Sequence, residues 1–235
     1  MRQLIVGDIH GCYDEFQELL DKAALAGDDE IIAIGDLVDR GPHSPSVLSF
    51  FRTTPKARSI IGNHERKHVR SFRGEIEPAA SQVITRHQIG PSDYAAAVEY
   101  MDSLPRYLRL ESAILVHGFW EPGVELAEQK ETVIVGTLSG EQYLRDRGLW
   151  PWYEHYDGDL PLIVGHRDYS GGQKRASDYK DRVYGLDSRC VYGGALSALL
   201  LPDFKLISVP SRADYWPQVQ RRYADILPLP EEADE

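Results

Sequence analysis

Five short apolar segments of this chain end in the same way, at a glycine next to side chains of the types that bind metal ions. In chain order they read RQLIVGDIHG, EIIAIGDLVDRG, ARSIIGNHE, AILVHG and PLIVGH. Their continuously apolar, β-rich character predicts buried strands. In α/β proteins, the loops that follow the carboxyl ends of the strands converge on one functional crevice. We therefore expect the polar residues of the five segments to meet at a single site.

The rest of the chain predicts helices in the first half and strands in the second. Residues 12–27 carry apolar side chains at helical spacing before Gly27, and residues 44–54 and 92–104 are further helix candidates. Runs of β-branched and aromatic residues predict strands at 106–111, 113–118, 131–136, 159–165, 182–187 and 204–210. The expected fold class is α/β, with two sheets packed as a sandwich and flanked by helices.

The length of 235 residues and the hydrophobic content of 42% predict one large domain. We place it at residues 1–210, with residues 211–235 as a C-terminal extension whose last residues are expected to be disordered. The chain has no bilayer-length apolar stretch and no export signal, and its two cysteines have no CxxC spacing. The expected location is the cytoplasm.

The net charge of −11 argues against an extended surface that binds nucleic acid. It does not exclude a small basic pocket on the acidic protein. Phosphorylated small molecules and phosphoproteins remain candidate substrates. The basic stretch RKHVRSFRG at 66–74 is read either as the solvated face of a helix or as a phosphate-binding wall.

The side chains expected at the common site combine imidazole with oxygen donors and contain no thiolate. They are Asp8, His10, Asp36, Asp39, Arg40, Asn63, His64, His117 and His166. This donor set favours borderline divalent metals such as manganese, iron or zinc. One aspartate with two oxygens is able to bridge two metals about 3.5 to 4 Å apart, an arrangement that activates water and clamps a phosphoryl group. The histidines outside these segments, His43, His68, His87 and His155, are given no role.

The motifs GDIHG, GDLVDRG and GNHE, followed by HG and GH, resemble the phosphoprotein-phosphatase family of binuclear calcineurin-like metallophosphoesterases. The resemblance extends over about residues 1–210 and implies two mixed β-sheets in a four-layer αββα fold. It also implies two divalent metal ions, with manganese the first choice and iron, zinc or nickel as alternatives. The implied activity is hydrolysis of phosphate esters through attack of a metal-bound hydroxide.

The resemblance also implies a role for each motif residue. Asp8 and His10 would bind the first metal, Asp36 would bridge both, and Asn63, His117 and His166 would bind the second. His64 would protonate the leaving group, Asp39 would orient its imidazole, and Arg40 would bind phosphate oxygens.

Several positions depart from the eukaryotic Ser/Thr phosphatases. Ile61 replaces an arginine and Cys12 a glutamine, which makes the chain similar to bacterial members such as the symmetrical diadenosine tetraphosphatases. Asp187 and Cys190 match a later segment of those hydrolases; we expect Asp187 to support the metal site and Cys190 to be a packed core thiol. The middle of the chain is similar to the phosphatase module of the bacterial polynucleotide kinase-phosphatase.

Two further positions stand beside metal ligands, and one expected residue lacks a clear candidate. Phe119 and Arg167 follow the expected ligands His117 and His166 closely, in places where relatives carry small residues. A second phosphate-binding arginine is expected in the middle of the chain, at Arg145 or Arg147.

The leading hypothesis is a metal-dependent phosphatase that acts on phosphomonoesters, with a phosphoprotein as substrate. The alternatives are a symmetrical bis(5′-nucleosyl)-tetraphosphate hydrolase and an RNA 3′-end phosphatase or 2′,3′-cyclic phosphodiesterase. For the nucleotide alternative, Trp150, Trp152, Tyr153 and Tyr156 would stack a base, although such a run is more often part of a core or a lid. The alternative outside catalysis is a metal-containing module that only binds phosphate, against which the presence of Asp39, Arg40 and His64 argues.

Overall fold

The computed structural model describes residues 1–227 of the chain. Within them two five-stranded mixed sheets pack against each other. The first sheet has the order β10-β9-β1-β2-β3, formed by Lys205–Pro210, Ala195–Leu201, Gln3–Val6, Glu30–Ala33 and Ala57–Ser59. The second has the order β4-β5-β6-β8-β7, formed by Tyr107–Arg109, Ile114–Val116, Leu162–Val164, Val183–Gly185 and Ser177–Tyr179. In each sheet three neighbouring strands pair in parallel, β1-β2-β3 in the first and β5-β6-β8 in the second. All the other pairs, β9 with β1, β10 with β9, β4 with β5 and β7 with β8, are antiparallel.

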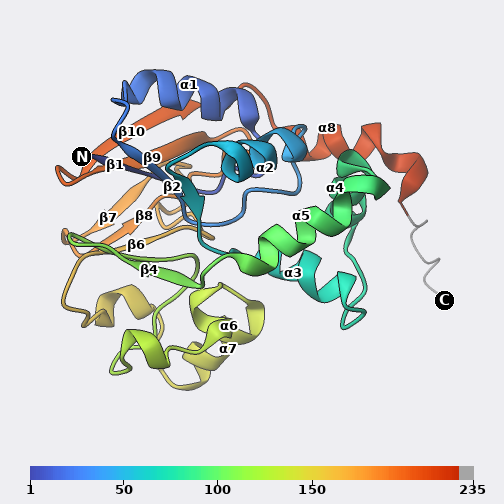
Figure 1. Ribbon diagram of the computed structural model, residues 1–235. Helices are drawn as coiled ribbons and strands as arrows, with labels where there is room; N and C mark the ends of the chain where they lie inside the picture. The colour runs from blue at the N-terminus through green and yellow to red at the C-terminus, as the bar shows by residue number, and fades with distance from the viewer. Residues whose placement is uncertain (228–235) are drawn as a thin grey trace.

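Helices cover the outer face of each sheet. The helices are α1 (Tyr13–Ala23), α2 (Ser44–Thr53), α3 (Asn63–Phe72), α4 (Ala80–Ile89), α5 (Pro91–Ser103), α6 (Glu131–Ile134), α7 (Leu138–Asp146) and α8 (Tyr215–Arg222). Single 3-10 turns form at Leu126–Glu128, Trp152–His155 and Ala224–Ile226. Figure 1 shows α1 and α2 on the side of the first sheet and α6 and α7 on the opposite side of the molecule. None of the helices in the described part of the chain is long and apolar enough to cross a bilayer.

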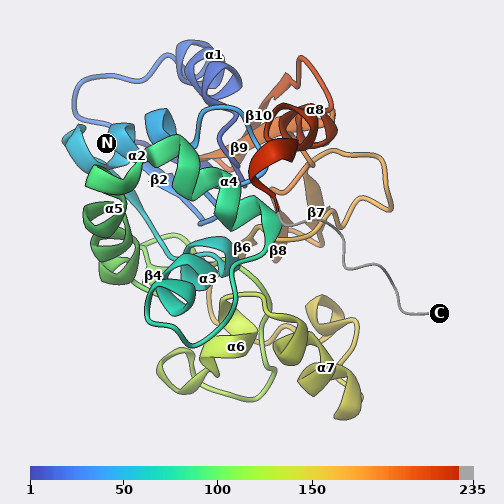
Figure 2. The same ribbon diagram turned by 90° about the vertical axis from the view of Figure 1, so that its right-hand side faces the viewer.

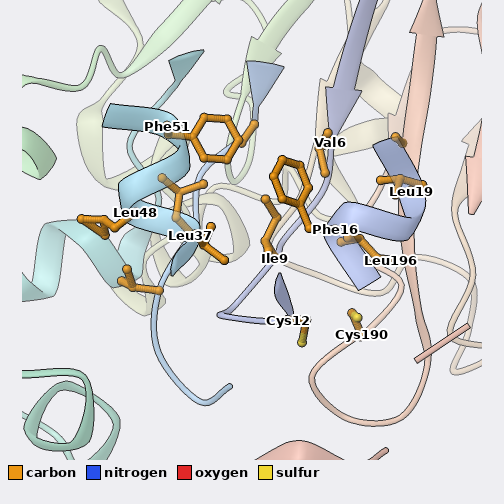
Figure 3. Close-up of a cluster of buried hydrophobic side chains, with 14 of the residues drawn as sticks. Val6, Ile9, Cys12, Phe16, Leu19, Leu37, Leu48, Phe51, Cys190 and Leu196 are labelled. Carbon is orange, nitrogen blue, oxygen red and sulfur yellow. The ribbon is translucent and has the colours of Figure 1, made fainter. Parts of the chain in front are cut away.

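Three buried hydrophobic clusters correspond to the three spaces between the four layers. The first, part of which is drawn in Figure 3, packs Phe16 and Leu19 of α1 and Phe51 of α2 against the first sheet. The second lies between the two sheets and joins Ile5 of β1 to Ile163 of β6. The third packs Val133 and Trp152 against the second sheet. This αββα layering is the fold class that the sequence predicts.

Most predicted elements are present with small shifts at their ends. The helix expected to stop at Gly27 ends at Ala23, because Ala24 adopts a left-handed conformation (φ 47°) and its N–H caps the last turn. The predicted helices at 44–54 and 92–104 correspond to α2 and α5. The predicted core position of Cys190 is also confirmed, since this residue is buried near Cys12 in the cluster of Figure 3.

The strand predicted at residues 131–136 is wrong. Residues Glu131–Ile134 form the short helix α6, and Gly136 follows with φ 73°. The run TVIV is apolar enough for a strand, but such short runs do not distinguish a buried strand from a buried helix. Here the carbonyl oxygens of Val133 and Ile134 accept hydrogen bonds from the N–H groups of Phe119 and Gly118 (3.0 and 2.7 Å). This backbone contact after β5, and not the local composition, sets the conformation.

Residues after 210 pack on the rest of the protein as far as the structure describes them. The Tyr215 hydroxyl and the Arg212 N–H both donate to the Glu15 carboxylate of α1 (2.7 and 3.0 Å). Figure 2 shows α8 beside α4, where Tyr223, just after α8, lies edge-on to His87. The boundary at residue 210 stays a prediction, and the disorder expected for the last residues falls outside the described residues.

Candidate metal centre

The carboxyl ends of six strands, drawn from both sheets, deliver the residues expected at the site. Asp8 and His10 follow β1, Asp36 and Asp39 follow β2, Asn63 and His64 follow β3, His117 follows β5, His166 follows β6 and Asp187 follows β8. Five of the residues expected at the site have positive φ, namely His10, Asp36, Asp39, Arg40 and His166. Conformations of this kind are rare away from glycine and cluster at functional sites.

Glycines allow these loops to lie so close together that a side chain at the same position would clash. A Cβ on Gly35 would lie 2.6 Å from the Gly62 nitrogen, and a Cβ on Gly62 would lie 2.2 Å from Asp36 Oδ1. A Cβ on Gly165 would lie 2.1 Å from Asp8 Oδ1. Each of these glycines therefore makes room for an expected metal ligand or for the loop that carries it.

Asp36 occupies the centre of the cluster. Its Oδ2 lies 3.4 Å from His10 Nε2 and 3.4 Å from His117 Nε2. The remaining ring nitrogens donate to backbone carbonyls, His10 Nδ1 to Val38 (2.8 Å) and His117 Nδ1 to Ile34 (2.7 Å). Hydrogen bonds of this kind fix the tautomer of a metal-binding histidine and direct its other nitrogen to the metal.

The second half of the cluster is centred on Asn63. Its Oδ1 lies 3.0 Å from His117 Nε2 and 2.9 Å from His166 Nδ1. The backbone N–H of His166 donates to both Asp8 oxygens (3.1 Å each). Asp36 with His117 and His166 forms one group of potential ligands, and Asp36 with His10 forms part of another. Asp36 is common to both groups.

Negative charge is crowded in this buried cluster. Burial and the neighbouring Asp187 raise the pKa of Asp8 well above its ordinary value, and burial also raises the pKa of Asp187. Burial and Asp36 raise the pKa of Glu65 to about 7. Burial alone would raise the pKa of Asp36 as well, but His117 and His64 outweigh it and hold that pKa well below its usual range. Divalent cations would compensate the excess charge, so the residues fit metal ions in donor type, burial and charge.

His64 lies next to the expected ligands and is held by Asp39. His64 Nδ1 lies 2.6 Å from Asp39 Oδ2, and His64 Nε2 is buried with no hydrogen-bond partner in the described structure. The ring stands edge-on to His10 at 4.8 Å between centroids. Burial lowers the pKa of His64, although Asp36 and Asp39 act in the opposite direction. An imidazole with one fixed nitrogen and one unpartnered nitrogen next to a metal cluster is well placed to exchange a proton with a bound substrate.

Sequence reasoning missed the residues that hold Asp39. His68 Nε2 lies 2.9 Å from Asp39 Oδ1, and His68 Nδ1 lies 2.9 Å from the Tyr94 hydroxyl of α5. Ser81 and Gln82 of α4 also donate to Asp39. His68 had a usable signal, since it stands four residues after His64 and thus on the same helix face. Gln82 had none, because no pattern in its own helix relates it to the motifs.

Glu65, the last residue of the GNHE motif, supports the loop after β2. Its carboxylate accepts the backbone N–H groups of Asp36, Leu37 and Gly62 at 2.8, 2.8 and 2.9 Å. Asp36 Oδ1 in turn accepts the His64 N–H at 3.0 Å. These bonds tie the loop after β2 to the N-terminus of α3, where unpaired N–H groups favour carboxylates.

The other residues named from the sequence lie around the cluster or away from it. Phe119 is fully buried and packs edge-on to the His166 ring at 5.1 Å. Arg145 pairs with Glu141 and stacks on Trp150 at 4.1 Å, and Arg147 lies over Tyr143 at 4.6 Å. Neither arginine is among the residues that line the cavity at His166, so a phosphate contact from either stays a prediction.

Two stretches for which the sequence left alternatives make contacts within the protein. Trp150, Trp152, Tyr153 and Tyr156 belong to the core of the second sheet or pack against it. In the basic stretch, Arg66 pairs with Glu131 (2.7 Å), and Arg70 and Arg73 pair with Glu75 and Asp102 (2.9 and 2.6 Å) around one cavity.

The family is defined by comparison with known proteins. The model of the calcineurin-like phosphoesterase family matches residues 1–193, which is most of the chain. The chain therefore belongs to the calcineurin-like phosphoesterases and is a phosphohydrolase. The family implies divalent metal ions, and the candidate ligand groups around Asp36 fit them.

Curated relatives and solved structures agree with this family. The chain is 30% identical to bis(5′-nucleosyl)-tetraphosphatase PrpE [asymmetrical] of Halalkalibacterium halodurans over 88% of this chain and 93% of the relative, and 26% identical to the PrpE of Bacillus subtilis over 90% and 95%. A crystal structure of a protein provisionally described as a diadenosine tetraphosphatase has a TM-score of 0.74 and 29% identity, covering 89% of this chain and 93% of that one. A yeast protein serine/threonine phosphatase with similarity to human PP5 shares the fold, with a TM-score of 0.60 and 15% identity over 91% of this chain and 80% of its own.

Proposed function

We propose that this chain hydrolyses dinucleoside polyphosphates of the bis(5′-nucleosyl)-tetraphosphate type. The observation that carries the proposal is the similarity to PrpE of Halalkalibacterium halodurans along nearly the whole of both chains. The name of that relative specifies asymmetrical cleavage, which divides a tetraphosphate into a nucleoside triphosphate and a nucleoside monophosphate. The symmetrical hydrolases named from the sequence motifs would release two nucleoside diphosphates instead.

The proposed centre holds two divalent metal ions, with manganese as the first choice. The position of Asp36 supports the count of two, because one of its oxygens is equidistant from His10 on one side and His117 on the other. In this assignment Asp8 and His10 serve one ion, Asn63, His117 and His166 the other, and Asp36 both. When bound, such ions lower the pKa of water and neutralise charge on the phosphoryl group.

The remaining steps belong to side chains of this protein. The Arg40 guanidinium lines the cavity at His166 and offers a planar fork of donors for phosphate oxygens. His64 delivers a proton from Nε2 to the departing oxygen, and Asp39 keeps the ring in position. In a polyphosphate the departing oxygen belongs to a phosphate, which is a far better leaving group than an alkoxide, so this substrate depends less on the proton.

A phosphomonoester remains the second candidate, favoured by the His64–Asp39 pair itself. A fully buried proton donor with an orienting carboxylate contributes most when the leaving group is a poor one. Phosphoserine peptides and RNA 3′-phosphates both have such leaving groups. The two unpaired cysteines suit the cytoplasmic location, which we retain as part of the proposal.

The test is product analysis with three substrates in parallel. Metal-stripped protein is reloaded with manganese and given diadenosine tetraphosphate, a phosphoserine peptide and an RNA oligonucleotide with a 3′-phosphate. We expect ATP and AMP in equal amounts from the first substrate, with the highest kcat/KM of the three. ADP as the product would reassign the cleavage as symmetrical, and faster release of phosphate from the peptide or the RNA would replace the proposal with the monoesterase.

A further inference from the structure

The cavity beside the expected metal ligands brings three arginines together. It has a volume of about 360 Å³ and is lined by Arg40, Arg167 and Arg189, by the carboxylates Asp168 and Asp187, and by the expected ligand His166. That volume falls within the roughly 300–1,000 Å³ of small-molecule sites. A cavity of this size has room for more than a single phosphate group.

The three arginines differ in how their charge is compensated. Arg167 forms an ion pair with Glu141, which also binds Arg145 at 2.8 Å. No carboxylate oxygen of residues 1–227 lies within 4 Å of a guanidinium nitrogen of Arg40 or Arg189. An unpaired guanidinium that faces a cavity is a strong donor for phosphate. The Arg189 guanidinium is unpaired and faces the cavity, and none of the roles proposed above uses it.

Tyr192 holds Arg40 and Arg189 on the same wall. The Arg189 guanidinium carbon lies 4.7 Å from the centre of the Tyr192 ring, and that of Arg40 lies 5.6 Å from it. Arg189 and Tyr192 are the ends of one tight turn, in which the Tyr192 N–H donates to the Arg189 carbonyl (3.0 Å). Cation–π contacts of this kind orient a guanidinium without using its N–H groups. In Arg40, Nη1 also lies 3.1 Å from His10 Nε2.

Packing and hydrogen bonds fix the backbone of this turn, so the position of Arg189 does not depend on a bound ligand. Cys190 and Val191, the two central residues of the turn, are buried in the cluster of Figure 3. The Arg189 N–H donates to Asp187 Oδ1 (2.8 Å), and Lys174 Nζ donates to the Tyr192 carbonyl (2.7 Å). Arg189 is therefore attached to the metal site through Asp187 and to the core through Cys190.

We propose that Arg189 is the binding residue of a second phosphate subsite, which takes a phosphate of a polyphosphate chain next to the one that reacts. Tyr192 is its positioning residue, since its ring orients Arg189 without a required contact to the ligand. The inference rests on the proposed function, because a substrate with a single phosphate would leave the subsite unused. It assigns the preference for polyphosphates to a residue outside the metal cluster.

The test compares two variants of the subsite with a matched control on two substrates, at a fixed excess of manganese. The variants are Arg189→Gln and Tyr192→Leu, and the control is Arg52→Gln, at an exposed arginine in the last turn of α2 outside the cavity. We expect Arg189→Gln to lower kcat/KM for diadenosine tetraphosphate about tenfold more than for p-nitrophenyl phosphate, mainly through KM. Tyr192→Leu should change the same ratio in the same direction, Tyr192→Phe should restore it, and Arg52→Gln should leave it at the wild-type value.

Inhibition by inorganic phosphates separates the inference from the proposed function. Tripolyphosphate and orthophosphate are measured as competitive inhibitors of p-nitrophenyl phosphate hydrolysis. We expect Arg189→Gln to weaken tripolyphosphate about tenfold more than orthophosphate, whether or not the wild-type enzyme cleaves diadenosine tetraphosphate. Equal changes for both inhibitors, or none, would overturn the subsite even if the dinucleotide is the substrate. Selective weakening of tripolyphosphate in an enzyme without dinucleotide turnover would keep the subsite and refute the proposed substrate.

Discussion

Asp39 shows how firmly His64, the proposed proton donor, is held in this protein. One oxygen binds His64 and the other binds His68, while Ser81 and Gln82 fill the remaining positions. Burial alone would raise the pKa of Asp39, but His68 and His64 hold it well below its usual range. The carboxylate thus stays charged and fixes the ring that we assign as proton donor.

Replacing that ring should affect substrates according to their leaving groups. We expect His64→Ala to lower kcat on an alkyl phosphomonoester by about 10² to 10⁴, the range of general acid catalysis. The loss on p-nitrophenyl phosphate and on diadenosine tetraphosphate should be much smaller, because their leaving groups need little proton transfer. The measurement is kcat for the three substrates, with bound metal determined alongside as the control. Equal losses on all three at full metal content would remove His64 from this role.

At the scale of elements, a single carboxylate joins β2 to α3. Glu65 accepts four backbone N–H groups from two loops, and these donors are buried. Glu65→Gln replaces one acceptor oxygen with an amide that faces donors, which leaves at least one N–H unsatisfied. We expect the free energy of unfolding to fall by about 1–3 kcal/mol.

Chemical denaturation of the metal-free protein measures this change apart from metal binding. The matched control is Glu75→Gln, since Glu75 forms an ion pair with Arg70 on the surface at 2.9 Å. An exposed pair of this kind contributes little, so the control should stay within about 0.5 kcal/mol of the wild type. An equally small effect of Glu65→Gln would contradict the assigned role of these hydrogen bonds.

The contrast between these elements explains what the sequence reveals and what it does not. Strand ends followed by ligand-type side chains are local patterns, and the convergence of such ends on one crevice is a general property of α/β sheets. The strand predicted at 131–136 failed because Gly118 and Phe119, far away in the chain, bind its backbone. Gln82 and Tyr192 were missed for a related reason, since helix α4 and the turn after Asp187 reach the site only through tertiary packing.

At the scale of the whole molecule, the metal site joins the two sheets. The loops of the first sheet supply Asp8, Asp36 and Asn63, and the loops of the second supply His117 and His166. A ligand that binds only the folded protein stabilises it, by about 2.7 kcal/mol at a concentration of 100 times Kd. Removal of metal should therefore lower the melting temperature of the whole domain in one transition.

Calorimetry with and without a chelator checks this prediction. Reloading with manganese should restore the wild-type melting temperature. The control variant Asp36→Asn lacks the shared ligand, so we expect it to lose one or both ions and to show a much smaller shift on reloading. A wild-type melting temperature that does not respond to metal, or full metal content in Asp36→Asn, would contradict the assignment of Asp36 as the ligand common to both groups.

The stability of the molecule in acid should depend in part on a carboxylate far from the metals. Asp29 accepts the backbone N–H groups of Arg2 and Ala26 and pairs with the Arg2 guanidinium at 2.6 Å, which ties the N-terminal strand to the turn before β2. The two backbone N–H groups, followed by the Arg2 side chain, lower the pKa of Asp29 below its ordinary value. A carboxylate with a lowered pKa in the folded state stabilises the protein above the pKa of the unfolded chain, about 3.9, and loses that contribution as the pH falls further.

Asp29→Asn should therefore reduce the melting temperature most at pH 5 and above, and its difference from the wild type should shrink below about pH 4. Asp203→Asn, in the exposed turn between β9 and β10, is the control and should show no such pH-dependent difference. If the melting temperatures of Asp29→Asn and the wild type differ by the same amount from pH 7 to pH 3, the lost stability comes from the changed shape of the side chain and not from the charge of Asp29.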